Sequence, residues 1–223
     1  MPLSSRKPAT GPTSAASLEV QDCFVSGFVR VWCLRHAESE NVIAGVSGAV
    51  PLSPLTSRGF RQAAVAARAL VDEPITGVYC STALRTRQTA AALLEGRSID
   101  IVALPELVEV GIGAAEATTD PGVRRQTAEV LRRWIVDLEL ERRVADGESG
   151  SQVVARMTTA LEQIRRAHDG ESVVLVGHVA SLSVTLAQLC GLGARVWGRP
   201  LPHAVPFLVE WDGRFWQCRS WPT

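Results

Sequence analysis

Short apolar runs alternate with longer amphipathic segments along the chain after residue 28. Four of the runs, mainly apolar throughout, are residues 29–34, 77–80, 101–104 and 172–176. Runs of this length are typical of strands buried on both faces of a parallel sheet. Two further runs, at residues 206–211 and 215–218, flank Asp212 and Gly213, a strong signal for a tight turn between antiparallel strands.

The segments between these runs have the periodicity of helices. Residues 55–71 begin with Thr56 as the expected N-cap, and we assign their buried face to Phe60, Ala64, Ala67 and Leu70. We expect further helices over residues 83–94, 121–140, 149–167 and 179–191. Strands that alternate with helices predict an α/β protein. We expect three layers, α/β/α, with a mostly parallel central sheet and an antiparallel edge at its C-terminal end.

The length of the chain fits one domain. A chain of 223 residues is long enough for one sizeable α/β domain and too short for two. We assign residues 29–223 to this single domain. Residues 1–28 are rich in Ser, Pro, Thr and Ala, and we expect a disordered tail there. A transit peptide is the disfavoured alternative, because the segment lacks Arg richness and helical amphipathicity.

Charge and cysteine content narrow the partners and the compartment. The 23 basic and 23 acidic residues cancel, so the whole molecule has no general attraction for nucleic acid or for an acidic membrane surface. No apolar stretch reaches the roughly 18 residues that a membrane span needs. The five cysteines are scattered and contain no C-x-x-C, which favours a reducing, cytoplasmic location. A homodimer is possible, and these observations do not bear on it.

Basic side chains are concentrated where three predicted strands end. Arg35 and His36 follow the first strand, Arg85 follows the second, and His178 follows the strand at residues 172–176. Ligands of open α/β sheets bind at the carboxyl ends of the strands. Because clustered cations repel one another, the natural partner at this edge is an anion. Arginine is suited to hold phosphate oxygens with two N–H groups, so the pattern predicts a phosphate site.

Other chemistries lack part of their sequence signature. His36 and Glu38 form the H-x-E of zinc deaminases, but the accompanying P-C-x-x-C is missing, and neighbouring arginines disfavour a metal. Cys80 and Arg85 are spaced C-x4-R, whereas a cysteine phosphatase loop needs C-x5-R. The chain has neither the G-x-x-x-x-G-K-[ST] loop of nucleotide hydrolases nor the G-x-S-x-G elbow of serine hydrolases. We therefore expect no metal in the site.

Six motifs occur in a characteristic order: L-R-H-A-E-S-E-N (34–41), P-L-T-S-R-G-F-R-Q-A (54–63), S-T-A-L-R-T-R-Q-T-A (81–90), L-V-E-V-G-I-G-A-A-E-A (107–117), G-E-S-G-S-Q-V-V-A-R (147–156) and V-L-V-G-H-V-A-S-L (174–182). Together they resemble the motifs of the histidine phosphatase superfamily, in the branch that includes cofactor-dependent phosphoglycerate mutases and many small phosphatases. The resemblance extends over about residues 29–219 and implies a phosphoglycerate mutase-like fold.

The resemblance also implies roles for the residues at the strand ends. His36 is expected to be the nucleophile that forms a phosphohistidine, and a neutral imidazole needs no deprotonation at about pH 7. The side chains expected to neutralise the phosphoryl oxygens are Arg35, Arg85 and His178. Further donors are expected from the Asn41 side chain and the Val179 backbone N–H at a helix start.

Glu109 is expected to be the general acid, which protonates the leaving oxygen and later activates water. Glu106 and Glu116 are the competing carboxylates, and the L-x-E spacing favours Glu109. Three residues depart from the family pattern: Ala37, Val179 and Ala117 stand where glycine is common. These departures concern the shape of the substrate and the rate more than the chemistry.

We expect a phosphatase that acts on a small phosphorylated metabolite and needs neither a metal nor an organic cofactor. A phosphoglycerate-type phosphomutase is one alternative, although only residues 111–147 are long enough to cover a substrate. A non-catalytic relative that binds a phosphorylated ligand is another. Four arginines lie within residues 111–147: Arg124, Arg125, Arg132 and Arg133. They either meet a second anionic group of the substrate or form the solvated face of a helix, and we favour the solvated face.

Overall fold

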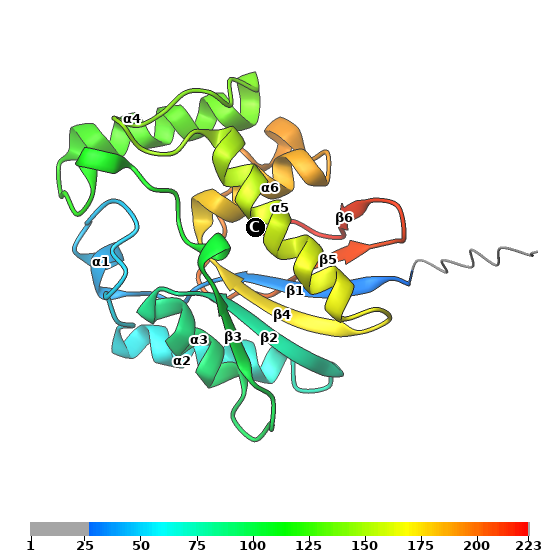
Figure 1. The fold of residues 1–223 in the computed structure, drawn as a ribbon. Helices are drawn as coiled ribbons and strands as arrows, with labels where there is room; N and C mark the ends of the chain where they lie inside the picture. The colour runs from blue at the N-terminus through cyan, green and yellow to red at the C-terminus, as the bar shows by residue number, and fades with distance from the viewer. Residues whose placement is uncertain (1–26, 223) are drawn as a thin grey trace, which may run out of the picture.

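A single six-stranded sheet forms the centre of the protein (Figure 1). The computed structural model describes residues 27–222, so the tail expected at residues 1–28 lies almost entirely outside the described residues. The strands are β1 (Val29–Arg35), β2 (Ile75–Ser81), β3 (Ile101–Leu104), β4 (Ser172–Gly177), β5 (Phe207–Trp211) and β6 (Trp216–Cys218). Each predicted apolar run is therefore a strand.

The order of the strands is β3-β2-β4-β1-β5-β6. The four strands from β3 to β1 pair in parallel, whereas β5 is antiparallel to β1 and β6 is antiparallel to β5. This arrangement confirms the predicted mostly parallel sheet with an antiparallel C-terminal edge. Because β1, β4 and β2 are neighbours, the three strand ends that carry basic residues lie next to one another.

Helices cover both faces of the sheet, which confirms the three-layer prediction. Figure 1 shows α5 and α6 on one face, α2 and α3 on the other, and α1 and α4 toward the carboxyl ends of the strands. The helices are α1 (Glu40–Ile43), α2 (Ser57–Ala69), α3 (Leu84–Leu93), α4 (Pro121–Arg132), α5 (Gly150–Ala167) and α6 (Val179–Leu189). Among residues 27–222, none of the helices is long and apolar enough to cross a membrane.

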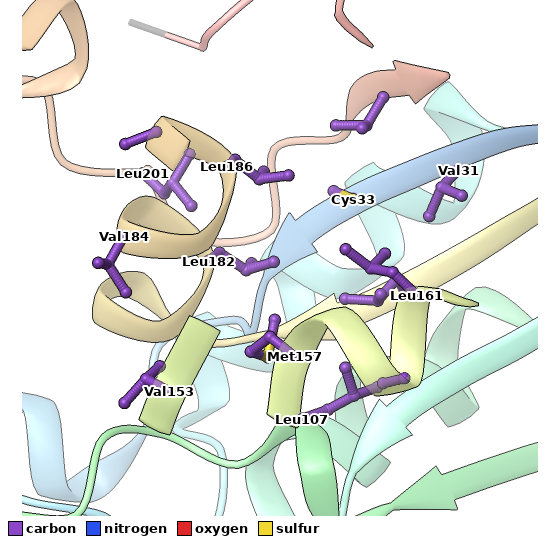
Figure 2. Packing of buried hydrophobic residues seen from close by; sticks show 14 of the residues in the cluster. Val31, Cys33, Leu107, Val153, Met157, Leu161, Leu182, Val184, Leu186 and Leu201 are labelled. Atoms are coloured by element: carbon purple, nitrogen blue, oxygen red, sulfur yellow. The ribbon is translucent and has the colours of Figure 1, made fainter. Parts of the chain in front are cut away.

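Two apolar cores lie on the two faces of the sheet because successive strand residues point to opposite sides. In β4, Val173 and Leu175 belong to the core beneath α5 and α6, whereas Val174 and Val176 belong to the core beneath α2 and α3. Figure 2 shows the first core, in which side chains from α5 and α6 meet Cys33 of β1. Burial on both faces explains why the parallel strands are continuously apolar.

The α2 helix begins where it was predicted to begin, but it buries a different face from the predicted one. Thr56 is the N-cap, and its hydroxyl accepts a hydrogen bond from the Gly59 N–H at 2.9 Å. Phe60, expected in the core, is 47% exposed. The buried face is made of small residues, Gly59, Ala63 and Ala66. A Cβ at Gly59 would lie 2.0 Å from the Glu38 carbonyl oxygen, so close backbone approach, rather than a bulky apolar stripe, sets this face.

The predicted helix at residues 121–140 is shorter in the structure. The α4 helix ends at Arg132 and continues as one π-helical turn, Arg133–Asp137. Leu138 then adopts a left-handed φ of 60°, which ends the helical segment. The buried Trp134 indole donates to the Arg142 carbonyl oxygen at 2.9 Å, so the chain turns back around this side chain. Periodicity could not show where the helix ends, because the apolar pattern continues through the π-helical turn.

The core beneath α5 and α6 should dominate the stability of the fold. Leu161 of α5 is 1% exposed, whereas Val65 of α2 is 55% exposed. We expect Leu161→Ala to lower the free energy of unfolding by about 2–5 kcal/mol, because it removes buried methyl groups and leaves a cavity. Val65→Ala should change it by less than about 0.5 kcal/mol. Urea unfolding of both variants measures the difference, and equal losses would contradict the assignment of the core.

Candidate active site

The sheet order brings the predicted site residues together from distant parts of the sequence. Arg35, the last residue of β1, pairs with Gly177 of β4, and the His36 N–H donates to the Gly177 carbonyl oxygen at 3.0 Å. His36 and His178 therefore leave adjacent strands side by side, with ring centroids 5.2 Å apart. Arg85 reaches the same place from the first turn of α3, which follows β2.

The contacts of His36 fix which ring nitrogen carries the proton. Its Nδ1 lies 2.7 Å from the Ala37 carbonyl oxygen and therefore donates a proton to it. Its Nε2 accepts a hydrogen bond from the Arg85 Nε–H at 3.2 Å. Since an arginine can only donate, Nε2 carries a lone pair. The structure thus presents an unprotonated Nε2 to the guanidinium.

Burial and positive charge keep both strand-end histidines neutral. Burial, reinforced by the Arg85 guanidinium, holds the pKa of His36 well below its ordinary value. Burial, followed by His36 and Arg85, lowers the pKa of His178 in the same way. Both effects disfavour the charged imidazolium. At neutral pH the two rings are therefore uncharged.

Arg85 is the most connected side chain of the site and is 1% exposed. Besides His36, its guanidinium donates to the carbonyl oxygens of Val50 at 2.7 Å and Ala49 at 2.8 Å, and to His178 Nδ1 at 3.2 Å. Val50 has a φ of 34°, a strained conformation for a β-branched residue. The arginine therefore holds a strained loop against the strand ends.

His178 lies behind Arg85 rather than at the surface of the site. It is 0% exposed, and its Nε2 is 2.7 Å from the Ser81 hydroxyl at the end of β2. The Ser81 hydroxyl is in turn 2.8 Å from the Thr86 hydroxyl. Because Nδ1 accepts from Arg85, Nε2 carries the proton that is donated to Ser81. In this arrangement His178 orients Arg85. The direct contact of His178 with phosphate stays a prediction.

Arg35 is held from the other side of His36. Its guanidinium donates to the Leu201 carbonyl oxygen at 3.2 Å, and its buried Nε has no hydrogen-bond partner among the described residues. Neither Arg35 nor Arg85 forms a salt bridge with a carboxylate of residues 27–222. Burial lowers the pKa of both guanidiniums, although both stay charged. The Glu109 carboxylate acts on both guanidiniums without forming a salt bridge with either. Two largely buried arginines that have no carboxylate in direct contact suit this site to an anion.

Glu109 lies at the opposite side of the site, against the start of α6. Its carboxylate accepts hydrogen bonds from the N–H groups of Val110 at 2.9 Å, Ala180 at 3.1 Å and Ser181 at 2.9 Å. A carboxylate at a helix N-terminus also interacts favourably with the helix dipole. Val179, whose N–H is a predicted phosphate donor, is the first residue of the same helix.

The two competing carboxylates take other positions. Glu116 accepts from the N–H groups of Ala49 at 2.7 Å and Ile112 at 2.8 Å, and so ties the loop that contacts Arg85 to residues 108–116. Glu106 lies in the short 3-10 helix Pro105–Leu107 and does not line the cavity of the site. Of the three, only Glu109 lines the same cavity as His36.

Asn41, in α1, is 9% exposed at the edge of the site. Its Oδ1 accepts a hydrogen bond from the Ser39 hydroxyl at 2.8 Å, and its backbone N–H donates to the Ser53 hydroxyl at 2.9 Å. With the oxygen already occupied, the amide N–H₂ is the group left to bind an anion. The predicted donor is thereby oriented before a ligand arrives.

One cavity of about 280 Å³ joins these groups. Six of the seven predicted site residues line it: Arg35, His36, Asn41, Arg85, Glu109 and Val179. Its outer wall comes from α4 and includes Arg124, which the sequence only weakly suggested as a ligand residue. A larger hollow of about 600 Å³ lies on the outer face of α5 and contains none of these residues. The catalytic groups identify the smaller cavity as the candidate site.

The three departures from glycine have different structural consequences. Ala37 and Val179 have no positive φ, so their backbone does not require glycine. Ala117 has a φ of 57°, in the left-handed region that favours glycine. Its N–H donates to the Ser47 carbonyl oxygen at 3.0 Å, and the Ser47 N–H donates to the Thr118 carbonyl oxygen at 2.8 Å. Two hydrogen bonds therefore hold Ala117 in a conformation that is strained for alanine.

Sequence reasoning missed His203, a third histidine of the site. Its Nδ1 is 2.9 Å from the His36 carbonyl oxygen, and the centroids of the two rings are 5.6 Å apart. Burial, followed by Arg35, lowers the pKa of His203. The residue comes from the connection before β5, where neither periodicity nor a strand end marks it. Among residues 27–222, no group of three His, Cys, Asp or Glu side chains is arranged to hold a metal ion.

Comparisons with known proteins agree with this geometry. The profile of the "Histidine phosphatase superfamily (branch 1)" matches residues 31–223. The chain is 31% identical over 171 residues to the adenosylcobalamin/alpha-ribazole phosphatase of Salmonella typhimurium, covering 76% of this chain and 84% of the relative. It is 29% identical over 192 residues to phosphoserine phosphatase 1 of Hydrogenobacter thermophilus, covering 83% and 88%.

A similarity to a solved structure confirms the expected phosphoglycerate mutase-like fold. The phosphoglycerate mutase of Bacillus anthracis superposes with a TM-score of 0.74, at 15% identity, over 87% of this chain and 92% of that chain. At this level of identity the likeness concerns the fold alone.

The histidine geometry predicts a specific titration behaviour. Because burial and Arg85 disfavour the charged ring, NMR signals of His36 and His178 should titrate well below about pH 6.5. The unfolded chain takes up these protons first, so the free energy of unfolding should fall as the pH drops below about 6.5. The urea-unfolded protein, in which all four histidines titrate normally, is the reference. A midpoint for His36 at or above the reference value would contradict the neutral ring.

Proposed function

The chain belongs to the histidine phosphatase superfamily, and we propose that it is a metal-independent phosphatase that hydrolyses a small phosphorylated metabolite through a phosphohistidine. The observation that carries this proposal is the presentation of His36. Its Nδ1 donates to a carbonyl oxygen, which leaves the Nε2 lone pair facing a guanidinium that forms no salt bridge with a described carboxylate. A phosphoryl group bound by that guanidinium would lie against the lone pair.

In the first step, His36 Nε2 attacks phosphorus and the bond from phosphorus to the leaving oxygen breaks. Negative charge accumulates on the phosphoryl oxygens in such a transfer. Arg85 and Arg35 supply two positive charges beside Nε2, and the Asn41 amide adds a neutral donor. His178 keeps Arg85 in place through its Nδ1. These donors already lie beside Nε2, and the Arg85 Nε–H, which donates to Nε2 in the structure, passes to a phosphoryl oxygen when Nε2 attacks.

Glu109 completes the cycle from the other side of the cavity. As the acid, which a dianionic substrate beside it favours, it gives its proton to the leaving oxygen. The resulting carboxylate takes a proton from water, and the hydroxyl attacks the phosphohistidine to release phosphate and restore the Nε2 lone pair. The N–H groups of Ala180 and Ser181 orient the carboxylate throughout.

Hydrolysis is favoured over a mutase reaction by the architecture around the cavity. A mutase must keep water from its phosphoenzyme, and the cover over this cavity comes from the twelve residues of α4 and the loop at residues 45–50. The names of similar proteins do not decide between the two reactions: two are phosphatases, at 31% and 29% identity, and another, from Serratia proteamaculans, is a probable phosphoglycerate mutase at 31% identity. A mutase remains the second candidate, and transfer of phosphate to an added alcohol rather than to water would identify it.

The nucleophile can be tested by phosphate release from a panel of phosphomonoesters between about pH 5 and 8, with EDTA present. We expect release to survive EDTA and to fall by more than about 1000-fold in His36→Ala, because the phosphohistidine cannot form without this ring. His168→Ala is the matched control, since this histidine lies with Tyr79 and Glu171 away from the cavity. Equal activity of the two variants would rule out the phosphohistidine route.

The role of Glu109 predicts a dependence on the leaving group. Glu109→Gln should lower kcat/KM for an alkyl phosphate by about 100-fold or more, because an alkoxide needs a proton to leave. The loss should be much smaller for p-nitrophenyl phosphate, whose phenolate leaves without one. Glu106→Gln is the control, since this carboxylate lies outside the cavity. The same loss for both substrates would show that Glu109 acts only in positioning.

A further inference from the structure

A second cavity adjoins the candidate active site. Its volume is about 240 Å³, and it shares three lining residues with the catalytic cavity: Ala128, Leu131 and Val179. The two cavities are therefore neighbouring compartments that share part of their wall. The catalytic compartment holds the charged groups, whereas no charged side chain lines the second compartment. We call the second one the apolar compartment.

The apolar compartment is built by three elements. Leu131 comes from α4 and Ile135 from the π-helical turn that follows it, Val179 begins α6, and the loop after α6 contributes Val196, Trp197 and Pro200. Ser183 is the one hydroxyl residue of its lining. Such a lining cannot satisfy a charged or strongly polar group, so an apolar ligand group is the one that it would bind.

Trp197 is the aromatic residue of this compartment. It is 37% exposed, although an apolar side chain of this size usually lies deeper. Its main chain is held in place: the backbone N–H of Trp197 donates to the Ala194 carbonyl oxygen at 3.1 Å, and the chain turns away at Gly198, whose φ is 75°. A partly uncovered indole in the wall of the compartment is suited to pack against the face or edge of a planar ring.

The position of the general acid shows which part of a substrate would enter the compartment. Glu109 binds the Ala180 N–H, so its carboxylate lies beside Val179, at the junction of the two compartments. The leaving oxygen must approach this carboxylate, while the phosphoryl group lies against His36 Nε2 and is bound by Arg85. The group attached to the leaving oxygen then continues past Val179 toward Trp197.

We propose, resting on the phosphatase function above, that the apolar compartment is a specificity subsite for a planar aromatic group on the leaving alcohol of the substrate. A cavity of about 150 Å³ is enough to hold benzene. The compartment, at about 240 Å³, therefore accommodates a ring with its substituents. The substrate class is a phosphomonoester in which a short linker separates the phosphate from an aromatic ring.

Binding of non-hydrolysable phosphonates tests this subsite without requiring turnover. We expect 3-phenylpropylphosphonate to bind at least about tenfold more tightly than propylphosphonate, measured by calorimetry, because only its ring reaches the apolar compartment. Trp197→Ala should reduce this ratio to less than about threefold. Phe215→Ala is the matched control: Phe215 is 55% exposed beside the β5–β6 turn, outside both compartments, and the ratio should stay unchanged.

Three outcomes would overturn the proposal: equal affinities in the unmodified protein, a ratio that Trp197→Ala does not change, and hexylphosphonate binding as tightly as the phenylpropyl compound. The last result would show that the compartment selects apolar length and not a ring. Phosphate release from propyl phosphate and 3-phenylpropyl phosphate, measured in parallel, tests the phosphatase function separately. A ring preference in binding without any release would leave the subsite in place and contradict hydrolysis.

Discussion

The buried Arg85 guanidinium is the interaction on which the rest of the site depends. It donates to two histidines on adjacent strands and to two carbonyl oxygens of a strained loop, and all of these acceptors are neutral. Hydrogen bonds satisfy the N–H groups, but they do not supply a counter-charge to a cation removed from water. Arg35, whose buried Nε has no hydrogen-bond partner among the described residues, is a second guanidinium without a salt bridge. The two guanidiniums therefore lack a carboxylate in direct contact, and a phosphate dianion would supply that partner.

The same charge sets the chemical state of the nucleophile. A histidine in water is partly protonated near neutral pH, and a protonated ring cannot attack phosphorus. Beside Arg85 and away from water, the His36 ring is neutral, and its bond to the Ala37 carbonyl oxygen directs the lone pair to Nε2. In the proposed mechanism, recognition of the anion and activation of the nucleophile thus have one physical origin. Glu109 is held by three backbone N–H groups and acts on both arginines without forming a salt bridge.

The two compartments divide recognition between charge and shape. The catalytic compartment would bind any phosphoryl group, because its contacts go to the phosphoryl oxygens alone. Discrimination among substrates must therefore come from surfaces further out, which are made by α4, the start of α6 and the loop that carries Trp197. These segments lie beyond the sheet, so they can vary without disturbing the strand ends that hold the catalytic groups.

The sequence by itself determined the strands, the layers and the basic residues at the strand ends, because burial on two faces leaves continuous apolar runs and the carboxyl ends of parallel strands share one edge. Only the tertiary structure decided what depends on contacts between distant segments. It turned the small face of α2 inward in place of Phe60, put His178 behind Arg85, and brought His203 to the site from an unmarked loop. It also placed the apolar compartment next to the catalytic one. Periodicity records which side of an element is buried, but not which distant residue will lie against it.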